Sequence, residues 1–302
     1  MHPVQSTRQF RDLTVLTLLL LACFAKPLYD LVRYALNSQL FSYVLLVPFI
    51  SLYLAWLKKE SLTTTGLPTR GLALIPSCAG VVVLLGYWFA ARSGSTMAQS
   101  EYLPWAIFGF FLLFVGACFL CLGREALRAL AFPLGFLAFI VPLPMWLTDR
   151  FENFLQHASA AGADAFFTLS GMPVLKQGLI FQLPGMRIEV APECSGIHST
   201  LVLFITSLIA AQLFLATPLK RAILVFAVIP LGILRNAFRI WTIGELCVHV
   251  DPGMINSPIH RRGGPLFFVL SLVPLFLLLY ILRRSEAKAK SERNVSPDTS
   301  NV

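Results

Sequence analysis

A cysteine stands at the start of a long apolar run. Glu193 to Gly196 (Glu-Cys-Ser-Gly) leads into Ile197 to Ala216, so the thiol of Cys194 lies at the N-terminal end of an expected transmembrane helix. Unpaired backbone N–H groups and the positive end of the helix dipole stabilise a thiolate at such a position. Because the thiolate is the nucleophilic form of cysteine, Cys194 is the first candidate for chemistry.

Two more chemically active groups follow along the chain. The next apolar segment contains Arg235, Asn236 and Arg239, and His260 lies in the loop after it. An ionisable residue inside a membrane span is costly and therefore indicates function. If that segment rises from the inner surface, ~1.5 Å per residue places Arg239 about 28 Å higher, near the outer edge of a ~30 Å core. Cys194 begins its helix at the same edge, so we expect cysteine, arginine and histidine at one membrane face.

Each of these residues also has a simpler interpretation. Arg239 could reach the outer lipid headgroups, and the deeper Arg235 could serve a structural pair instead of a reaction. A lone loop histidine such as His260 is most often solvated, and His198 competes with it because it lies one turn after Cys194 on the same helix face. The shared depth favours function, with His260 as the acid–base group and His198 in a supporting role.

The cysteines allow two further interpretations. Cys118 and Cys121 match a C-x-x-C redox pair, but they lie in the middle of an apolar run without the strand–helix context of such pairs. Cys194 and Cys247 should both lie near the outer face, so a disulfide between them is the structural alternative for Cys194.

A metal site is the other chemical alternative. Four residues, the cysteine included, carry side chains that can bind zinc, yet no closely spaced ligand pair recurs, so we expect neither a metal nor another cofactor. These residues are Glu193, Cys194, His198 and His260.

Composition defines the fold class. Of 302 residues, 57% are hydrophobic and only 13% are charged, which is more apolar than a soluble core requires. We predict an all-α polytopic membrane protein with about eight transmembrane helices, each near the ~20 residues that span a bilayer. The expected spans run near 13–32, 39–57, 71–91, 104–122, 127–147, 197–216, 222–247 and 264–282.

The only sizeable loop, about 148–193, changes its pattern twice. From Asp149 to Leu169 apolar residues recur at helical spacing with polar residues between them, which predicts an amphipathic helix lying in the membrane interface. From Leu179 to Val190 the period shortens to two around a turn at Pro184, which predicts a small extracytoplasmic β-hairpin. The hairpin leads directly to Cys194, so we expect it to set the height of the thiol.

The charges indicate orientation. A net charge of +9 raises nucleic acid as a partner, but the basic residues are scattered between apolar segments and form no stripe. They are about twice as frequent in the segments that lie inside if the N-terminus is cytoplasmic. We therefore expect both termini in the cytoplasm, with 148–196 and 248–263 outside.

Three regions follow from these patterns. Residues 1–147 form an N-terminal transmembrane scaffold of about five spans, and residues 148–282 form the catalytic region of interfacial helix, hairpin and about three spans. The polar residues 283–302 are expected to be a disordered cytoplasmic tail.

The order of these motifs resembles the exosortase/archaeosortase family of membrane-embedded cysteine transpeptidases. Cys-Ser-Gly begins one span, Asn-x-x-Arg-Ile lies in the next, and a histidine precedes a last span that contains glycine. The similarity covers about 150–282 and includes Asn153-x-Leu155-Gln156 and the strand from Gly178 to Pro184. The resemblance implies catalytic roles for Cys194, Arg239 and His260. It implies supporting roles for Gly196, Asn236, Arg235 and His198.

The same resemblance implies a substrate and a location. Family members are thought to recognise membrane-anchored proteins by a C-terminal sorting signal: a short motif (Pro-Glu-Pro in many bacteria), a transmembrane helix and a basic tail. They cut near the motif through a Cys acyl-enzyme and pass the protein to a surface acceptor, such as a polysaccharide or lipid. The expected location is the cell inner membrane, with the active site on its extracytoplasmic face and no nucleic acid as a partner.

Two other classes compete with a cysteine protease or transpeptidase. A non-enzymatic transporter or polysaccharide-export component could use Arg235 and Arg239 to line a path for an anionic substrate, although no internal repeat supports it. A membrane O-acyltransferase would need a histidine within a long apolar catalytic span, and none is found.

Overall fold

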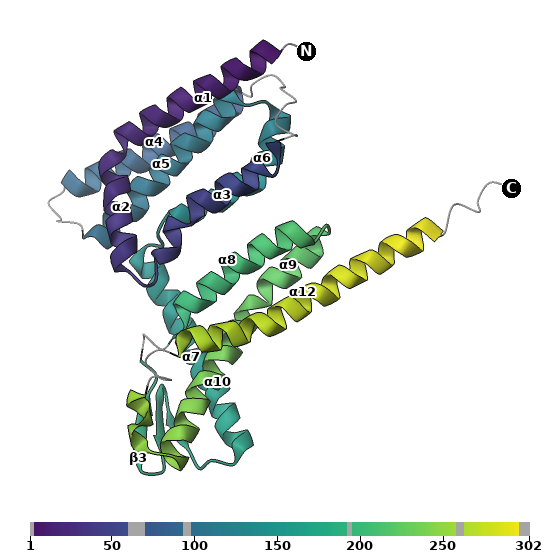
Figure 1. The fold of residues 1–302 in the computed structure, drawn as a ribbon. Helices are drawn as coiled ribbons and strands as arrows, with labels where there is room; N and C mark the ends of the chain where they lie inside the picture. Colours follow the sequence, from purple (N-terminus) through teal and green to yellow (C-terminus); the bar gives the residue numbers. More distant parts are fainter. Residues whose placement is uncertain (1–2, 60–69, 93–97, 192–194, 258–262, 296–302) are drawn as a thin grey trace. The chain divides into compact units, whose positions relative to one another are not determined.

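The computed structural model describes residues 3–59, 70–92, 98–191, 195–257 and 263–295. These fall into two compact units, Met1–Thr148 and Asp149–Val302, which are described separately (Figure 1).

Helices make up the first unit. The longest pair, α4 and α5, pack along their length, and a Cβ placed on Gly109 of α5 would lie 2.6 Å from Leu84 of α4, so only glycine permits this approach. α1 and α2 also pack on α5, and α3 packs on α6. The helices are α1 (Pro3–Cys23), α2 (Ala25–Asn37), α3 (Val47–Trp56), α4 (Arg70–Arg92), α5 (Gln99–Cys121) and α6 (Arg124–Leu137), with 3₁₀ turns at Ser42–Leu45 and Ala138–Ile140.

The second unit combines helices with a small sheet. In Figure 1, α8, α9 and α12 lie side by side, and α7, α10 and the strands form a second cluster. Its elements are α7 (Met145–Ser170), β1 (Leu175–Gln177), β2 (Ile180–Leu183), β3 (Met186–Glu189), α8 (Ile197–Phe214), α9 (Pro218–Phe226), α10 (Val228–His249), a 3₁₀ turn (Pro252–Asn256) and α12 (Gly264–Val295).

The sheet is antiparallel, in the order β1-β2-β3. Two-residue turns join its strands, and Gly178 and Gly185 take positive φ values of 64° and 77° there. The predicted hairpin over 179–190 is confirmed as β2 and β3. β1 was missed, because three residues are too few for alternation to be visible in the sequence.

The sheet and two helices share one core. Phe181 of β2 and Phe167 of α7 are fully buried there, with ring centroids 5.5 Å apart. α7 and α10 meet at Gly162, where an added Cβ would lie 2.8 Å from the Cβ of Ala237. This close approach fixes α10, which carries the arginines, against α7 and the sheet.

The predicted fold class is confirmed: the described chain is a helical, polytopic membrane protein with one small sheet. Five of its helices are long and apolar enough to cross a membrane, or up to seven if each of two bent pairs is one span. Five of the eight predicted spans, namely 71–91, 104–122, 197–216, 222–247 and 264–282, correspond to such helices.

The other three predicted spans differ from expectation. The first is the pair α1 and α2, bent by 71°, and the second is a shorter apolar helix, Ser42–Trp56. The fifth is interrupted after Ile140, because Pro142 and Pro144 prevent the helix from continuing.

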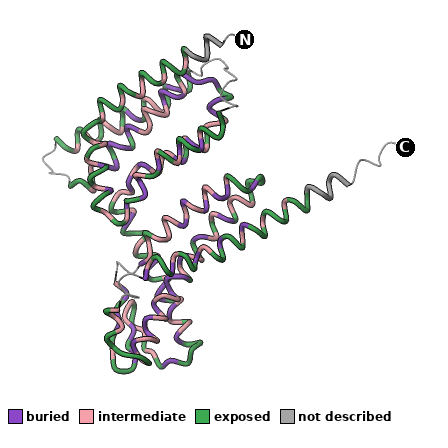
Figure 2. The backbone as a smooth tube through the Cα atoms, in the orientation of Figure 1, coloured by how far each residue is buried: buried purple, intermediate pink, exposed green. Residues whose placement is uncertain are grey.

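Many apolar side chains are exposed along these helices, as a lipid-facing surface requires. Val82 of α4 and Val273 of α12 are among them. Figure 2 shows exposed residues along helices of both units.

The C-terminal region departs from its prediction. Residues 283–302 were expected to be disordered, whereas α12 continues as a helix to Val295. Glu286 of this extension accepts hydrogen bonds from the backbone N–H of Ala216 (3.0 Å) and Thr217 (2.9 Å), just before α9 begins. Lys220 of α9 donates to the hydroxyl of Ser285 (2.8 Å). The polar residues at this end therefore bind the α8–α9 connection, and these contacts stabilise the continued helix.

Candidate active site

The turn before α8 depends on a glycine. Gly196 is the N-cap residue of α8 and has φ +74°, in the left-handed region that side chains disfavour. A Cβ at this position would also lie 2.8 Å from Nη2 of Arg235 and 3.1 Å from Cγ of Asn236. Both the backbone conformation of Gly196 and its surroundings therefore exclude a side chain at this position, which agrees with a supporting role for the glycine in the turn after the cysteine.

The carbonyl of Gly196 connects α8 to α10. It accepts hydrogen bonds from Thr200 N (3.0 Å), the Ser199 hydroxyl (3.2 Å) and Nη2 of Arg235 (3.2 Å). Arg235 Nη2 also lies 3.4 Å from the hydroxyl oxygen of Thr200. The arginine of one helix is thus bound to the first turn of the other.

Arg235 is a buried charge. Only 7% of the residue is exposed, and Nη1 is buried without a hydrogen-bond partner among the described residues. No carboxylate in the described part of the chain forms an ion pair with it. A buried cation without an anion is unfavourable, so this site favours a negative charge nearby.

Asn236 and Arg239 follow on the same helix. Asn236 is almost fully buried, and Arg239, one turn above Arg235, is half-buried. Both line a small pocket between α10 and β3, to which the strand contributes Ile188 and Glu189 and the residue after it, Val190. The pocket combines apolar walls with a guanidinium, an amide and a carboxylate.

α7 holds both ends of the segment that contains the cysteine. Gln156 donates a hydrogen bond from Nε2 to the carbonyl of Val190, just after β3. Four residues earlier, Glu152 accepts a hydrogen bond from the Ser195 hydroxyl (3.3 Å). Ser195 is buried, and its oxygen lies 3.4 Å from the N–H of Ile197 at the start of α8. Residues 190 and 195 are therefore both attached to one helix.

The helix predicted over 149–169 is confirmed as part of α7. Leu155, Gln156, Ser159 and Phe167 are buried, whereas Phe151, Asn153, Phe154 and His157 are exposed. Both faces of the helix therefore mix polar and apolar residues, and the buried face carries a polar group that binds the segment before the cysteine. The signal that sequence reasoning missed is the i, i+4 spacing of Glu152 and Gln156.

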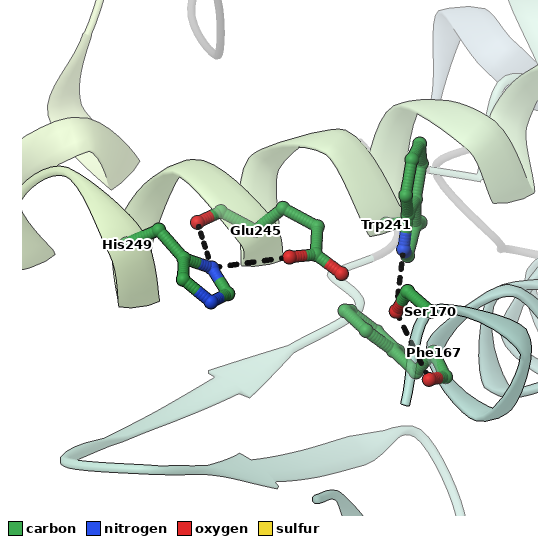
Figure 3. A network of polar contacts seen from close by, with 5 residues as sticks. All are labelled: Phe167, Ser170, Trp241, Glu245 and His249. Atoms are coloured by element: carbon green, nitrogen blue, oxygen red, sulfur yellow. Dashed lines mark hydrogen bonds and ion pairs between the residues drawn. The ribbon is translucent and has the colours of Figure 1, made fainter. Parts of the chain in front are cut away.

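A polar contact joins α10 to the end of α7 (Figure 3). The indole N–H of Trp241 donates to the Ser170 hydroxyl at the end of α7 (3.2 Å), and that hydroxyl donates to the carbonyl of Phe167 (3.0 Å). Two turns later, Nδ1 of His249 lies 3.1 Å from the carboxylate of Glu245, a contact within α10 itself. Through Trp241, the helix that carries the arginines is bound to α7.

Two of the predicted site residues, Cys194 and His260, lie outside the described residues. The structure brings Arg235, Asn236 and Gly196 together and places Arg239 one turn further along α10. His198, one turn after Cys194 in the sequence, is exposed on α8. Cys247, the alternative disulfide partner of Cys194, is a buried free thiol.

Comparison with known proteins gives one match. A family model described as transmembrane exosortase matches residues 35–277, which is most of the chain. No curated protein and no solved structure matches the chain.

Gly196→Ala should lower the rate at which Cys194 reacts with iodoacetamide by about tenfold, because a smaller fraction of the thiol is ionised. The added methyl group displaces Arg235 and the start of α8, two residues after Cys194 in the sequence. The rate is measured in a variant whose other five cysteines are replaced. Gly171→Ala is the matched control, because Gly171 has the same φ of +74° but no atom near the added Cβ. Equal rates in the two variants would contradict the prediction.

Proposed function

The chain belongs to the transmembrane exosortase family, and on this premise we propose that it is a membrane cysteine protease or transpeptidase. Its substrates are exported, membrane-anchored proteins with a C-terminal sorting signal of the Pro-Glu-Pro type. The observation that carries the proposal is the hydrogen bond from Arg235 to the carbonyl of Gly196. It attaches the helix with the two arginines to the turn two residues after Cys194.

The reaction uses the three residues Cys194, Arg239 and His260. The Cys194 thiolate attacks the substrate carbonyl carbon and forms a C–S bond, and Arg239 stabilises the oxyanion. As the C–N bond breaks, His260 gives its proton to the leaving amine, which leaves a thioester on the enzyme. A nucleophile of the acceptor then attacks the thioester and loses its proton to His260, and the Cys194 thiolate leaves. If water attacks instead, the thioester is hydrolysed.

Charge near the thiol supports this mechanism. Burial of a thiol in an apolar setting opposes ionisation, so a thiolate needs cations and N–H groups close by. Arg235 is buried beside the cysteine turn and lacks a carboxylate partner in the described part of the chain. The start of α8 adds its unpaired N–H groups.

The location follows from the same chemistry. We propose that the protein lies in the inner membrane, with both termini cytoplasmic and the thiol on the outer side, where exported proteins arrive. The acceptor is a surface molecule, such as a polysaccharide or lipid, with a nucleophilic group.

Orientation can be tested at position 176 in β1. In a variant without native cysteines, Lys176→Cys should react with a membrane-impermeant maleimide added from outside, because basic residues favour an external 148–196. If position 176 were labelled only after the membrane is permeabilised, the topology would be the reverse of the proposed one and the mechanism would be excluded.

Cys194→Ala and His260→Ala should each abolish processing of a sorting-signal substrate, while His198→Ala should retain most of it. His198 is exposed on α8, whereas a loop histidine can reach the leaving amine. Processing is measured by the size shift of the substrate, and the wild type should yield a thioester-linked substrate on Cys194. A transporter would form no such adduct. Full activity in His260→Ala with loss in His198→Ala would make His198 the acid–base group.

The two arginines should differ in their response to lysine. Arg239→Lys should lower kcat by about a hundredfold without loss of folded protein, because an ammonium replaces the planar donor to the oxyanion. Arg235→Lys should lower kcat less than Arg239→Lys does. It should lower the thermal midpoint of unfolding, since a lysine cannot reproduce the hydrogen bonds to Gly196 and Thr200. If Arg235→Lys instead abolished catalysis in a stable protein, the oxyanion role would move to Arg235.

A further inference from the structure

β3 is an edge strand that leads to the cysteine. It pairs with β2 on one side only, and four residues lie between its last residue, Glu189, and Cys194. Gln156 binds the chain at Val190 and Glu152 binds it at Ser195, so the strand is fixed relative to the residues on both sides of the cysteine.

The hydrogen-bond pattern identifies the backbone groups on the open side. Val190 donates to the carbonyl of Leu179, and the two-residue turn closes at the pair Leu183 and Met186. In an antiparallel pair, alternate residues point their N–H and C=O groups at the partner strand. The N–H and C=O groups of residues 186, 188 and 190 therefore point toward β2. Those of Arg187 and Glu189 point away from it. In the described part of the chain, no residue forms a hydrogen bond with these backbone groups on that side.

We propose that this edge binds the substrate protein by adding an extended peptide to β3, next to the bond that is cut. The inference rests on the proposed function, because it uses Cys194 as the nucleophile. Main-chain hydrogen bonds to Arg187 and Glu189 supply affinity that does not depend on side chains. At ~3.3 Å per residue, the end of β3 lies within about 17 Å of Cys194 along the chain. The substrate residues that pair with β3 therefore lie within about five residues of the cleaved bond.

The pocket beside β3 fits this occupant. Glu189 and Val190 line it together with Asn236 and Arg239 of α10. A strand added to β3 lies ~4.8 Å from it, so a carbonyl group of the peptide is within reach of the pocket. With a volume of about 20 Å³ the pocket has room for a carbonyl oxygen but not for a side chain, so the edge accepts residues of many kinds.

A second copy of the chain is a poorer occupant. β3 has only four residues, and pairing at so short an edge buries far less than the ~1,000 Å² expected of a stable interface. A peptide already anchored in the same membrane needs much less area, because its local concentration is high.

The test removes the edge N–H groups without breaking the sheet. Arg187→Pro and Glu189→Pro each delete an N–H that faces away from β2, at positions where an edge strand tolerates proline. Each variant should lower the processing rate by about tenfold at subsaturating substrate. Lys176→Pro is the matched control: residues 175 and 177 of β1 face β2, so the N–H of Lys176 points away at the opposite edge. Its processing rate should stay within about twofold of the wild type.

A second measurement separates binding from damage to the site. In the background with Cys194 as the only cysteine, the proline variants should react with iodoacetamide at the wild-type rate, because the thiol itself is untouched. On the substrate side, N-methylation of single backbone amides should slow processing at every second position, which is the period of a strand.

The outcomes distinguish this inference from the proposed function. If Glu189→Pro processes substrate normally while Cys194→Ala is inactive, the edge is not the binding site but the function stands. If Cys194→Ala remains active, the function itself is wrong. Slower alkylation of Cys194 in the proline variants, or a change in oligomeric state without a change in processing, would also overturn the inference.

Discussion

A buried arginine is the constraint on which the site depends. The guanidinium of Arg235 is removed from water and must be satisfied by protein groups, and it finds the carbonyl of Gly196 and the hydroxyl of Thr200. Those contacts require α8 and α10 to approach closely. Gly232 allows this, because a Cβ there would lie 2.7 Å from the Thr200 hydroxyl. The same crowding requires a glycine at 196, so the turn after Cys194 and the arginine helix form one unit.

α7 supplies the second constraint on the cysteine. Gln156 and Glu152 of this helix hold the chain at Val190 and Ser195, and Phe167 of the same helix packs in the core with the sheet. A membrane protein can satisfy buried polar groups only internally, so such contacts are costly to break. They give β3 and the start of α8 defined positions relative to each other. A short strand can then present a peptide to a nucleophile a few residues away.

The proposed chemistry is divided among separate segments of the chain. The proposed nucleophile precedes a helix start, the two arginines lie on a neighbouring helix, and the proposed proton donor belongs to a segment after that helix. Groups from different segments can approach opposite sides of a carbonyl, which residues on one helix face cannot do. This separation is the physical reason to prefer His260 over the exposed His198 as the acid–base group.

The sequence alone determined the class of the protein and the hairpin before the cysteine, and it nominated the residues of the candidate site. Hydropathy, alternation and the cost of intramembrane charge are local properties, so they are readable without coordinates. Only the tertiary structure decided that Gln156 and Ser159 of α7 are buried, that β1 extends the sheet and that Arg235 binds the carbonyl of Gly196. Periodicity does not show which residues of a membrane helix contact protein and which contact lipid. Contact between Arg235 and Gly196 across 39 residues depends on how closely glycines let helices pack.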